Sequence, residues 1–343
     1  MNSFGRIFRV SIFGESHGES VGIVVDGCPA GLPLTINDFL PDLERRKGGT
    51  QKGTTPRQED DLPIFKSGLF NDKATGAPIA ILFENKNIRS GDYEKQRDIP
   101  RPGHADFVAH KKFGGFEDYR GSGHFSGRLT VALVAAGVIA KKILNLNSIR
   151  TGTSSATSEI KITSATLEIG GEKDLDKGLQ KAIDQKDSIG GIIECRVTGL
   201  PIGLGEPFFD SAESLLSHIV FAIPAVRGIE FGTGFAAARM FGSEHNDAIE
   251  NMNGKTRTNH AGGIVGGLTN GNELVFRIAI KPTSSTPKEQ HTLNWQTGQI
   301  EDASVKGRHD LCIALRVPVI LESVTAIVLA DLMLLEQRIP RID

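Results

Sequence analysis

The 343-residue sequence lacks several features that would each assign it to a class of protein. Its three cysteines, Cys28, Cys195 and Cys312, are odd in number and far apart, which argues against a disulfide scaffold or a C-x-x-C metal site. The net charge of -2, without aromatic residues among the basic ones, disfavours a nucleic-acid partner. No apolar run reaches the roughly 18 residues of a membrane span without a charge, and the N-terminus lacks the order of a signal peptide. We therefore expect a cytoplasmic protein with no membrane or nucleic-acid partner.

The sequence is instead rich in glycine, with 40 glycines against one tryptophan and two tyrosines. Glycine costs backbone entropy unless a turn or a close approach needs it, so many tight loops are expected. Between these loops no linker or repeat divides the chain, and one domain over residues 1–343 is expected. Hydrophobic spacing predicts strands over 6–13, 21–26, 62–66, 78–84, 189–198 and 273–281, and helices over 35–47, 126–144, 174–186, 211–223 and 318–337.

The stretch Gly14-Glu15-Ser16-His17-Gly18 fits the G-x-S-x-G pattern of a hydrolase nucleophile elbow. An elbow needs a strand before the serine and a helix after it. Here β-branched runs lie on both sides of the motif, which predicts a turn between two strands. A serine hydrolase that uses Ser16 is one alternative, and a glycine-flanked hairpin with a surface serine and histidine is the other.

A second stretch, Gly232-Thr-Gly-Phe-Ala-Ala237, fits the dinucleotide fingerprint G-x-G-x-x-A after a strand-like run. That fingerprint requires an acidic residue at the tip of a second strand about 20 positions later. Residues 244–259 are polar and turn-rich instead. We interpret the stretch as a turn with close backbone packing.

Basic residues and histidines gather in the predicted loops. The basic residues form either a solvated face or an anion pocket, because arginine forks match the oxygens of phosphates and carboxylates. The histidine spacing fits no zinc pattern, so no metal is expected, and acid–base chemistry on an anionic substrate is the favoured hypothesis. The residues are Arg45, Arg46, Lys47, Lys52, Arg57, Arg97, Arg101, Arg120 and Arg128, with His17, His104, His124 and His309.

Two further loops have the composition of a phosphate site. TNHAGGIVGG (258–267) is glycine-rich, and KPTSST (281–286) follows a predicted strand directly. Hydroxyls, a lysine and exposed backbone N–H groups could hold a phosphate there. Turn chemistry alone explains either loop equally well.

Taken in order, a set of motifs resembles the chorismate synthase family from about Phe4 to the C-terminal helix: FGESHG, LERRKGGT, RPGHAD, DYRGSGHFSGR, SIGGIIECRVTGLPIGLGEP, NHAGGIVGG, KPTSS and KGRHDLC. The resemblance implies an α+β fold, a β-α-β sandwich with a helical layer between two antiparallel sheets, assembled as a homotetramer. It implies a shikimate-pathway lyase that converts 5-enolpyruvylshikimate 3-phosphate to chorismate by 1,4-anti elimination of phosphate. The implied cofactor is reduced FMN, used without net redox change, and NADPH is a candidate reductant. A flavin- or phosphate-binding protein without catalysis is the remaining alternative.

The resemblance also assigns roles to single residues. His17 would protonate the departing phosphate and His104 the reduced flavin, with Ser16 and Ser126 as hydroxyl partners in proton relay. Asp310 would sit by the flavin N5 and help to accept the C6 proton. The substrate and cofactor pocket would be lined by Arg46, Arg101, Arg128 and, where the family usually has an arginine, Lys52. The flavin-binding positions would be His124, Phe125, Ser126, Ala225, Gly266, Lys281, Pro282, Thr283, Ser284, Ser285 and Arg308.

The chain departs from the family in two places. Many members read Arg-Ser-Ser-Ala-Arg-Glu-Thr where residues 124–130 here read His-Phe-Ser-Gly-Arg-Leu-Thr, and Pro224 stands where asparagine is expected. An arginine and a glutamate are thus absent from the local flavin contacts, while Ser126 and Arg128 remain. We interpret the loop as a variant of an active site.

Overall fold

Two antiparallel sheets form the outer layers of the fold in the computed structural model, which describes residues 1–49, 52–55, 59–87, 97–146, 159–305 and 309–337. The first sheet has the order β1 (Ser3–Phe4), β2 (Arg9–Gly14), β3 (Ser20–Asp26), β7 (Ile79–Glu84) and β4 (Ile64–Ser67). The second sheet has the order β10 (Val226–Phe231), β13 (Leu274–Ile280), β9 (Gly191–Thr198) and β8 (Lys161–Ile169).

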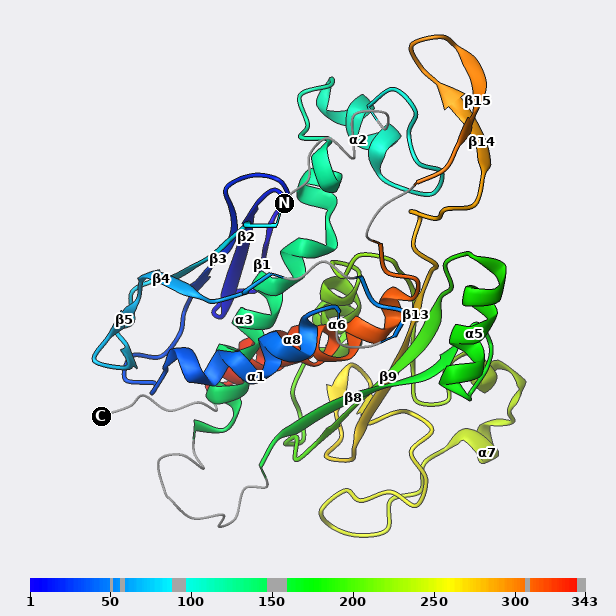
Figure 1. Cartoon of the computed structure of the whole chain (residues 1–343). Helices are drawn as coiled ribbons and strands as arrows, with labels where there is room; N and C mark the ends of the chain where they lie inside the picture. The colour runs from blue at the N-terminus through cyan, green and yellow to red at the C-terminus, as the bar shows by residue number, and fades with distance from the viewer. Residues whose placement is uncertain (50–51, 56–58, 88–96, 147–158, 306–308, 338–343) are drawn as a thin grey trace.

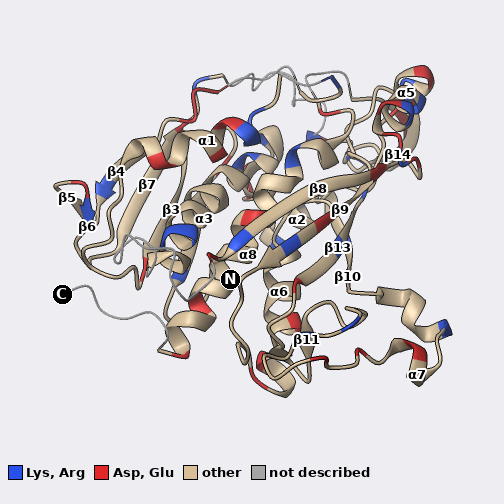
Figure 2. Ribbon diagram, turned by 90° about the horizontal axis from the view of Figure 1, so that it is seen from below, with Lys and Arg blue, Asp and Glu red and all other residues tan. Residues whose placement is uncertain are grey.

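A layer of helices lies between these sheets. α3 (Thr130–Leu144) contacts β3 and β7 of the first sheet, and α8 (Val317–Leu335) contacts β8 and β9 of the second. α3 and α8 pack against each other, and α1 (Ile36–Arg46) and α6 (Ala212–Val220) pack against α8. Figures 1 and 2 show α1, α3 and α8 between the two sheets. The predicted β-α-β sandwich is therefore confirmed.

Close packing of α3 on α8 depends on one glycine. A Cβ on Gly137 would lie 2.3 Å from the Cβ of Ser323, so a larger residue there would push the two helices apart. The segment Ile313–Leu335 is apolar and long enough to span a bilayer, but 89% of its most hydrophobic window is buried inside the fold. It is therefore a core helix of the sandwich.

The predicted elements are all present, with shifted boundaries. The helix expected from residue 126 begins at Thr130, because Ser126 instead caps a short 3-10 turn, Gly127–Leu129, by accepting the Arg128 N–H. Sequence reasoning missed β8, which alternates exposed and half-buried residues and carries few large apolar side chains. It also missed α2 (Asp106–Phe113) and the hairpin of β14 (Gln290–Asn294) and β15 (Gln299–Ala303). The predicted helix over 174–186 is α5 (Leu175–Gln185), and the remaining short elements are β5 (Leu69–Phe70), β6 (Lys73–Ala74), α7 (Gly242–His245), β11 (Ile264–Val265) and β12 (Leu268–Thr269).

A buried carboxylate on α8 holds the turn that enters β2. Asp331 is only 5% exposed and accepts the backbone N–H groups of Arg6 at 2.9 Å, Ile7 at 2.7 Å and Phe8 at 2.8 Å. We expect Asp331→Ala to lower the free energy of unfolding by about 3 kcal/mol, because it leaves three backbone N–H groups, that of Phe8 buried, without their charged acceptor. Urea unfolding measures this loss.

The matched variant is Asp331→Asn. Its amide oxygen replaces the atom that binds Ile7 and Phe8, so it should retain more stability than the alanine variant. A change below about 0.5 kcal/mol for Asp331→Ala, the size expected of an ordinary surface substitution, would contradict the assignment.

Candidate active site

A cavity of about 390 Å³ lies where the C-terminal end of α1 meets the N-terminal ends of α3 and α8. Both helix N-termini favour negative charge, because their unpaired N–H groups point outward. Loops that follow β2 and β13 and precede β10 complete the wall. Most residues assigned from the resemblance line this cavity: Ser16, Arg46, Arg101, His104, Phe125, Ser126, Arg128, Ala225, Lys281, Thr283, Ser284, Ser285 and Asp310.

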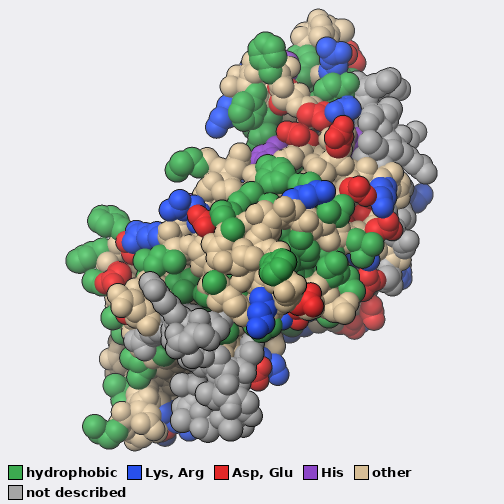
Figure 3. Space-filling view, turned by 90° about the vertical axis from the view of Figure 1, so that its left-hand side faces the viewer, with side chains coloured by type: hydrophobic (Ala, Val, Ile, Leu, Met, Phe, Trp, Pro, Cys, Tyr) green, Lys and Arg blue, Asp and Glu red, His purple; other side chains and the backbone are tan. Residues whose placement is uncertain are grey.

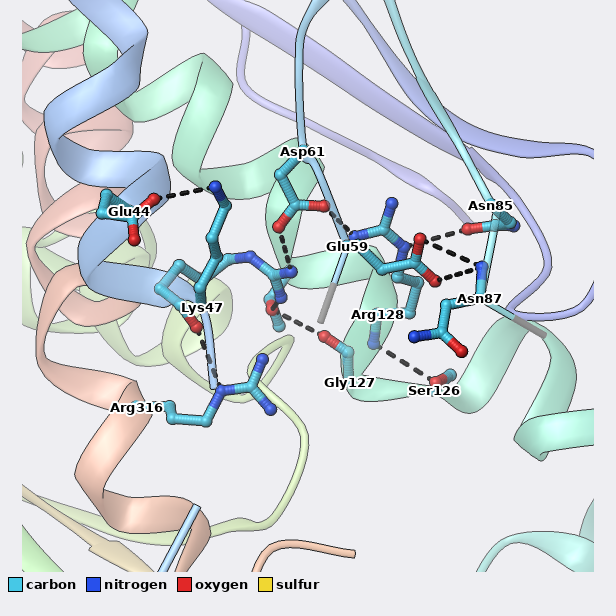
Figure 4. A network of polar contacts seen from close by, with 12 residues as sticks. Glu44, Lys47, Glu59, Asp61, Asn85, Asn87, Ser126, Gly127, Arg128 and Arg316 are labelled. Carbon is cyan, nitrogen blue, oxygen red and sulfur yellow. Dashed lines mark hydrogen bonds and ion pairs between the residues drawn. The ribbon is translucent and has the colours of Figure 1, made fainter. Parts of the chain in front are cut away.

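Two of the cavity arginines share one buried carboxylate. Arg46 binds Asp61 at 2.9 Å and Arg128 binds its other oxygen, and all three side chains are no more than 4% exposed. Burial raises the pKa of Asp61, but the charges and hydrogen bonds of Arg46 and Arg128 outweigh it and hold that pKa below its usual range. Figure 4 shows Asp61 facing Arg128 and the loop of Ser126. Arg46, Arg128 and Asp61 together carry one net positive charge, and the carboxylate of Glu59 lines the cavity beside them.

Arg128 lies in the loop before α3 and is held in position by contacts with the end of β7. Its Nε donates to Asn85 at 2.9 Å and its Nη2 to the Glu84 carbonyl at 3.1 Å, both at the end of β7. Burial lowers the pKa of Arg128, while the charge of Asp61 acts in the opposite direction. The guanidinium is thereby fixed against the first sheet with its charge partly balanced.

The third arginine lies beside a histidine. Arg101 donates from Nη1 to Ser285 at 3.1 Å and from Nη2 to Ser122 at 2.9 Å. Its Nη2 also lies 3.1 Å from Nδ1 of His104. Asp106 binds both residues, and although burial raises its pKa, hydrogen bonds from Arg101 and His104 hold that pKa far below its usual range.

Asp310 lies on the wall formed by the start of α8. Its Oδ1 accepts the Thr55 N–H at 2.8 Å, and its Oδ2 accepts Nη1 of Arg316 at 3.1 Å. Arg316 also donates from Nε to the Arg46 carbonyl at 3.0 Å (Figure 4). Burial lowers the pKa of Arg316, against the charge of Asp310. Sequence reasoning missed Arg316 because it lies inside an apolar helical run and outside every quoted motif.

Lys281 and Arg227 place two more cations on the opposite wall. Lys281 Nζ donates to Ser284 at 2.7 Å, and Ser284 donates to the Gly103 carbonyl at 2.8 Å. Burial and the charge of Arg227 lower the pKa of Lys281. Arg227, which the sequence motifs did not single out, lines the cavity as well. Taken with the three buried arginines, these contacts support the anion-pocket hypothesis over a solvated face.

Five assigned residues are not among the described residues that line the cavity, and the assigned Arg308 and the basic candidate Arg57 are not described. His124 bonds the Gly14 carbonyl at 2.8 Å, and Lys52 reaches Gln180 at 3.3 Å. Gly266 lies in the turn between β11 and β12, and Pro282 follows Lys281 along the wall. His17 lies behind Ser16 and Gly121. Arg57 and Arg308 lie outside the described residues.

The packing around His17 is tight. Ser16 and His17 are 1% and 4% exposed, so a surface serine and histidine is the wrong description of this hairpin. The nucleophile-elbow hypothesis also fails, since β3 and not a helix follows the serine. Gly121 has φ +56°, and a Cβ there would lie 2.5 Å from Nε2 of His17 and 3.1 Å from the Ser16 hydroxyl. Only glycine leaves room for this histidine next to the cavity.

Comparison with known proteins identifies the family. A sequence model of the chorismate synthase family matches residues 8–334. The chain is 68% identical to the chorismate synthase of Chitinophaga pinensis, covering 100% of this chain and 99% of that protein. It is 40% identical to the chorismate synthase of Methanocaldococcus jannaschii, covering 97% of this chain and 96% of that protein. The chain belongs to the chorismate synthase family. A crystal structure of a chorismate synthase shares the fold, with a TM-score of 0.71 at 24% identity over 97% of this chain and 93% of that one.

Membership of the chorismate synthase family makes the protein a lyase of the shikimate pathway and implies a reduced flavin cofactor. The cavity fits such a group in two respects. Arg46 Nε and Thr283 Oγ1 line it and are buried without a hydrogen-bond partner among the residues that the structure describes. Buried polar atoms of this kind call for an additional partner. The cavity volume also lies within the range of sites for small molecules and cofactors.

The residues that depart from the chorismate synthase pattern lie in different parts of the structure. His124 turns toward the β2 carbonyl of Gly14, and Leu129 packs in the hydrophobic core. Pro224 lines the cavity itself. A flavin contact through His124 stays a prediction, whereas Ser126 and Arg128 lie where the resemblance requires them.

Arg316 provides a test of this site. We expect Arg316→Lys to lower kcat/KM by about 10- to 100-fold, because lysine lacks the planar fork that reaches both Asp310 and the Arg46 carbonyl, and a hydrogen bond to a charged group is worth about 1.5–3 kcal/mol. Steady-state kinetics measures the change. Arg239→Lys, at an exposed position outside the cavity, is the matched control. Equal activity of the two variants would show that Arg316 does not organise the site.

Proposed function

We propose that this chain catalyses the 1,4-anti elimination of phosphate from 5-enolpyruvylshikimate 3-phosphate to give chorismate, with reduced FMN as the cofactor. The observation that supports it most is the set of buried cations around one cavity that also holds histidine, serine and aspartate groups. The substrate carries a phosphate and two carboxylates, and each matches the fork of an arginine. Arg46, Arg101 and Arg128 are the three buried arginines in reach of such a ligand.

Reduced FMN, when bound, supplies the electron-transfer and proton-accepting chemistry of the elimination. Ser284 and Ser285, with Lys281, offer hydroxyl and ammonium donors that suit its polar groups. The buried polar atoms of Thr283, next to these residues, and of Arg46, on the opposite wall, are further donors. These residues bind and orient the cofactor.

The chain's own acids and bases move the protons. His17 holds the proton for the leaving phosphate oxygen, and Ser16 lies between it and the cavity. Asp310 is an acceptor whose carboxylate is oriented by the Thr55 N–H and by Arg316. His104 exchanges a proton on the wall that Arg101 shares. Ser16 and His17 lie where burial excludes bulk water and strengthens electrostatic effects.

We propose that the enzyme acts as a homotetramer in the cytoplasm. Exposed phenylalanines before α6 and after β10 support an assembly surface, since Phe208, Phe209, Phe235 and Phe241 are between 77% and 92% exposed. Figure 3 shows the molecule from the left-hand side of Figure 1, where exposed hydrophobic side chains are interspersed with charged ones. One domain over residues 1–343 stays a prediction, as does NADPH as the reductant of the flavin.

The test is turnover under defined redox conditions. Purified protein given 5-enolpyruvylshikimate 3-phosphate and chemically reduced FMN without oxygen should release chorismate and phosphate. Folded protein that binds FMN tightly without turnover would instead support the non-catalytic alternative. An assay in air with NADPH as the sole reductant decides whether the chain reduces its own flavin.

A further inference from the structure

Asp106 connects His104 and Arg101, and the resemblance assigns it no role. Its Oδ1 lies 2.5 Å from Nδ1 of His104 and 2.8 Å from Nη2 of Arg101. Its Oδ2 accepts Nε of Arg101 at 2.8 Å and the Arg101 backbone N–H at 3.0 Å. One carboxylate therefore binds the imidazole and the guanidinium that face the cavity.

Asp106 binds His104 and Arg101 from outside the larger cavity. It is the first residue of α2 and is not among the described residues that line the 390 Å³ cavity, whereas His104 and Arg101 are. A second cavity, of about 80 Å³, is lined by Asp106 and His104 together, on the side of α2 and Trp295. His104 thus separates Asp106 from the larger cavity. Asp106 acts through other residues and does not itself face a ligand there.

The chemistry of this contact selects one form of the histidine. An ionised carboxylate only accepts hydrogen bonds, so the proton of a neutral imidazole is held on Nδ1. Nε2, which lies 3.4 Å from Nη2 of Arg101, is then the ring atom that can accept a proton. Hydrogen bonds of this kind fix tautomer and ring orientation in metal-binding histidines by the same physics. The guanidinium of Arg101, 3.1 Å from the same Nδ1, is held in place by the same carboxylate.

We propose that Asp106 is a positioning residue that fixes the Nδ1–H tautomer of His104 and the orientation of Arg101. Proton exchange and anion binding on this wall are then set by one side chain. The inference rests on the proposed function in so far as His104 transfers a proton during turnover.

A double-mutant cycle tests the kinetic part. Asp106→Asn keeps the shape but presents an amide that can donate toward Nδ1, so we expect kcat to fall by about 10- to 100-fold, the usual effect of losing a group that orients a reactive one. In a His104→Ala background the same change should lower kcat by less than about 3-fold, because residues that act as a unit are not additive. The proposal is overturned if Asp106→Asn lowers kcat by the same factor in both backgrounds, or lowers kcat in neither.

Ser122→Ala is the matched variant for the Arg101 contact. Its hydroxyl binds Nη2 of Arg101 at 2.9 Å without a hydrogen bond to His104 among the described contacts. We expect it to raise KM with little change in kcat, whereas Asp106→Asn changes both. If Ser122→Ala lowers kcat as far as Asp106→Asn, the carboxylate has no specific effect on His104 and the proposal fails.

A spectroscopic measurement keeps the proposal testable if Asp106→Asn does not fold or if the protein shows no turnover. Nitrogen-15 NMR of histidine-labelled wild-type protein, assigned by loss of the signal in His104→Asn, reports the tautomer at a pH where the imidazole is neutral. A proton on Nδ1 supports the proposal, and a proton on Nε2 overturns it. This result does not depend on activity, so it separates a failure of this inference from a failure of the proposed function.

Discussion

Replacing His17 by alanine is expected to slow turnover by about 10²- to 10⁴-fold, the usual contribution of a general acid, while flavin binding stays nearly unchanged. The imidazole is buried against Gly121 and next to Ser16, which lines the cavity, so a proton can pass from it to a bound group through Ser16, while Lys281 and Ser284 line the cavity without it. Burial raises the pKa of the neighbouring Asp118, but the hydrogen bonds and charge of Arg120, with a smaller effect from the charge of His17, hold that pKa below its usual range. Single-turnover kinetics with reduced FMN measures the loss directly.

Two variants make this result specific. Gly121→Ala keeps the histidine but places a Cβ 2.3 Å from its Cδ2 at a glycine with φ +56°, so it should displace the ring and lower turnover as well. His291→Ala removes an exposed histidine from the β14–β15 hairpin, whose contact is with Asp302, and should leave turnover unchanged. Wild-type activity in His17→Ala would refute the role of His17 as the acid.

The second large effect is expected at Asp61. Asp61→Asn leaves Arg46 and Arg128 as neighbouring buried cations without their shared anion, and breaking a buried pair in this way costs about 3–5 kcal/mol. The free energy of unfolding should fall by this amount at pH 7, as measured by urea denaturation. kcat/KM should fall too, because both guanidinium groups lose a fixed partner.

The matched control is the neighbouring acid. Asp60 is 65% exposed and pairs with Lys86 at 3.3 Å on the surface, where such pairs contribute about 0–1 kcal/mol. Asp60→Asn should therefore change stability by less than about 1 kcal/mol. Equal losses at the two positions would contradict the importance of the buried arginine pair.

Lowering the pH should remove the stabilising effect of the Asp61 carboxylate. The pKa of Asp61 is lowered in the folded protein, so its stabilising effect is complete above the unfolded-state pKa of about 3.9 and is lost as pH falls through the lower folded-state value. The difference in stability between wild type and Asp61→Asn should accordingly shrink below about pH 4. A constant difference down to the folded-state pKa would show that the charge of Asp61 is not what stabilises the fold.

Sequence reasoning located the elements that carry a strong apolar period. α3 and α8 are apolar around most of their surface, and β3 and β7 consist of β-branched and other apolar residues. The exposed edge strand β8 has no such pattern, so it was missed. The layer order needs contacts between residues far apart in the chain, and only the resemblance to a family supplied it.

The site was predicted best where a motif carries its own chemistry. Ser16, Arg46 and Asp310 were found in quoted motifs and meet at one cavity. Arg316 was missed because its role comes from the fold, which brings the start of α8 against the end of α1. The position of a side chain also cannot be read from a motif, as His124 shows by turning to the Gly14 carbonyl.

The most direct test of the central claim is the stoichiometry of one reaction. Substrate, phosphate, chorismate and the flavin absorbance should be followed together in the absence of oxygen, with reduced FMN and 5-enolpyruvylshikimate 3-phosphate in excess over enzyme. An elimination at the cavity described predicts equal amounts of chorismate and phosphate and no net oxidation of the flavin. Phosphate without chorismate, or flavin oxidised in step with the product, would contradict it.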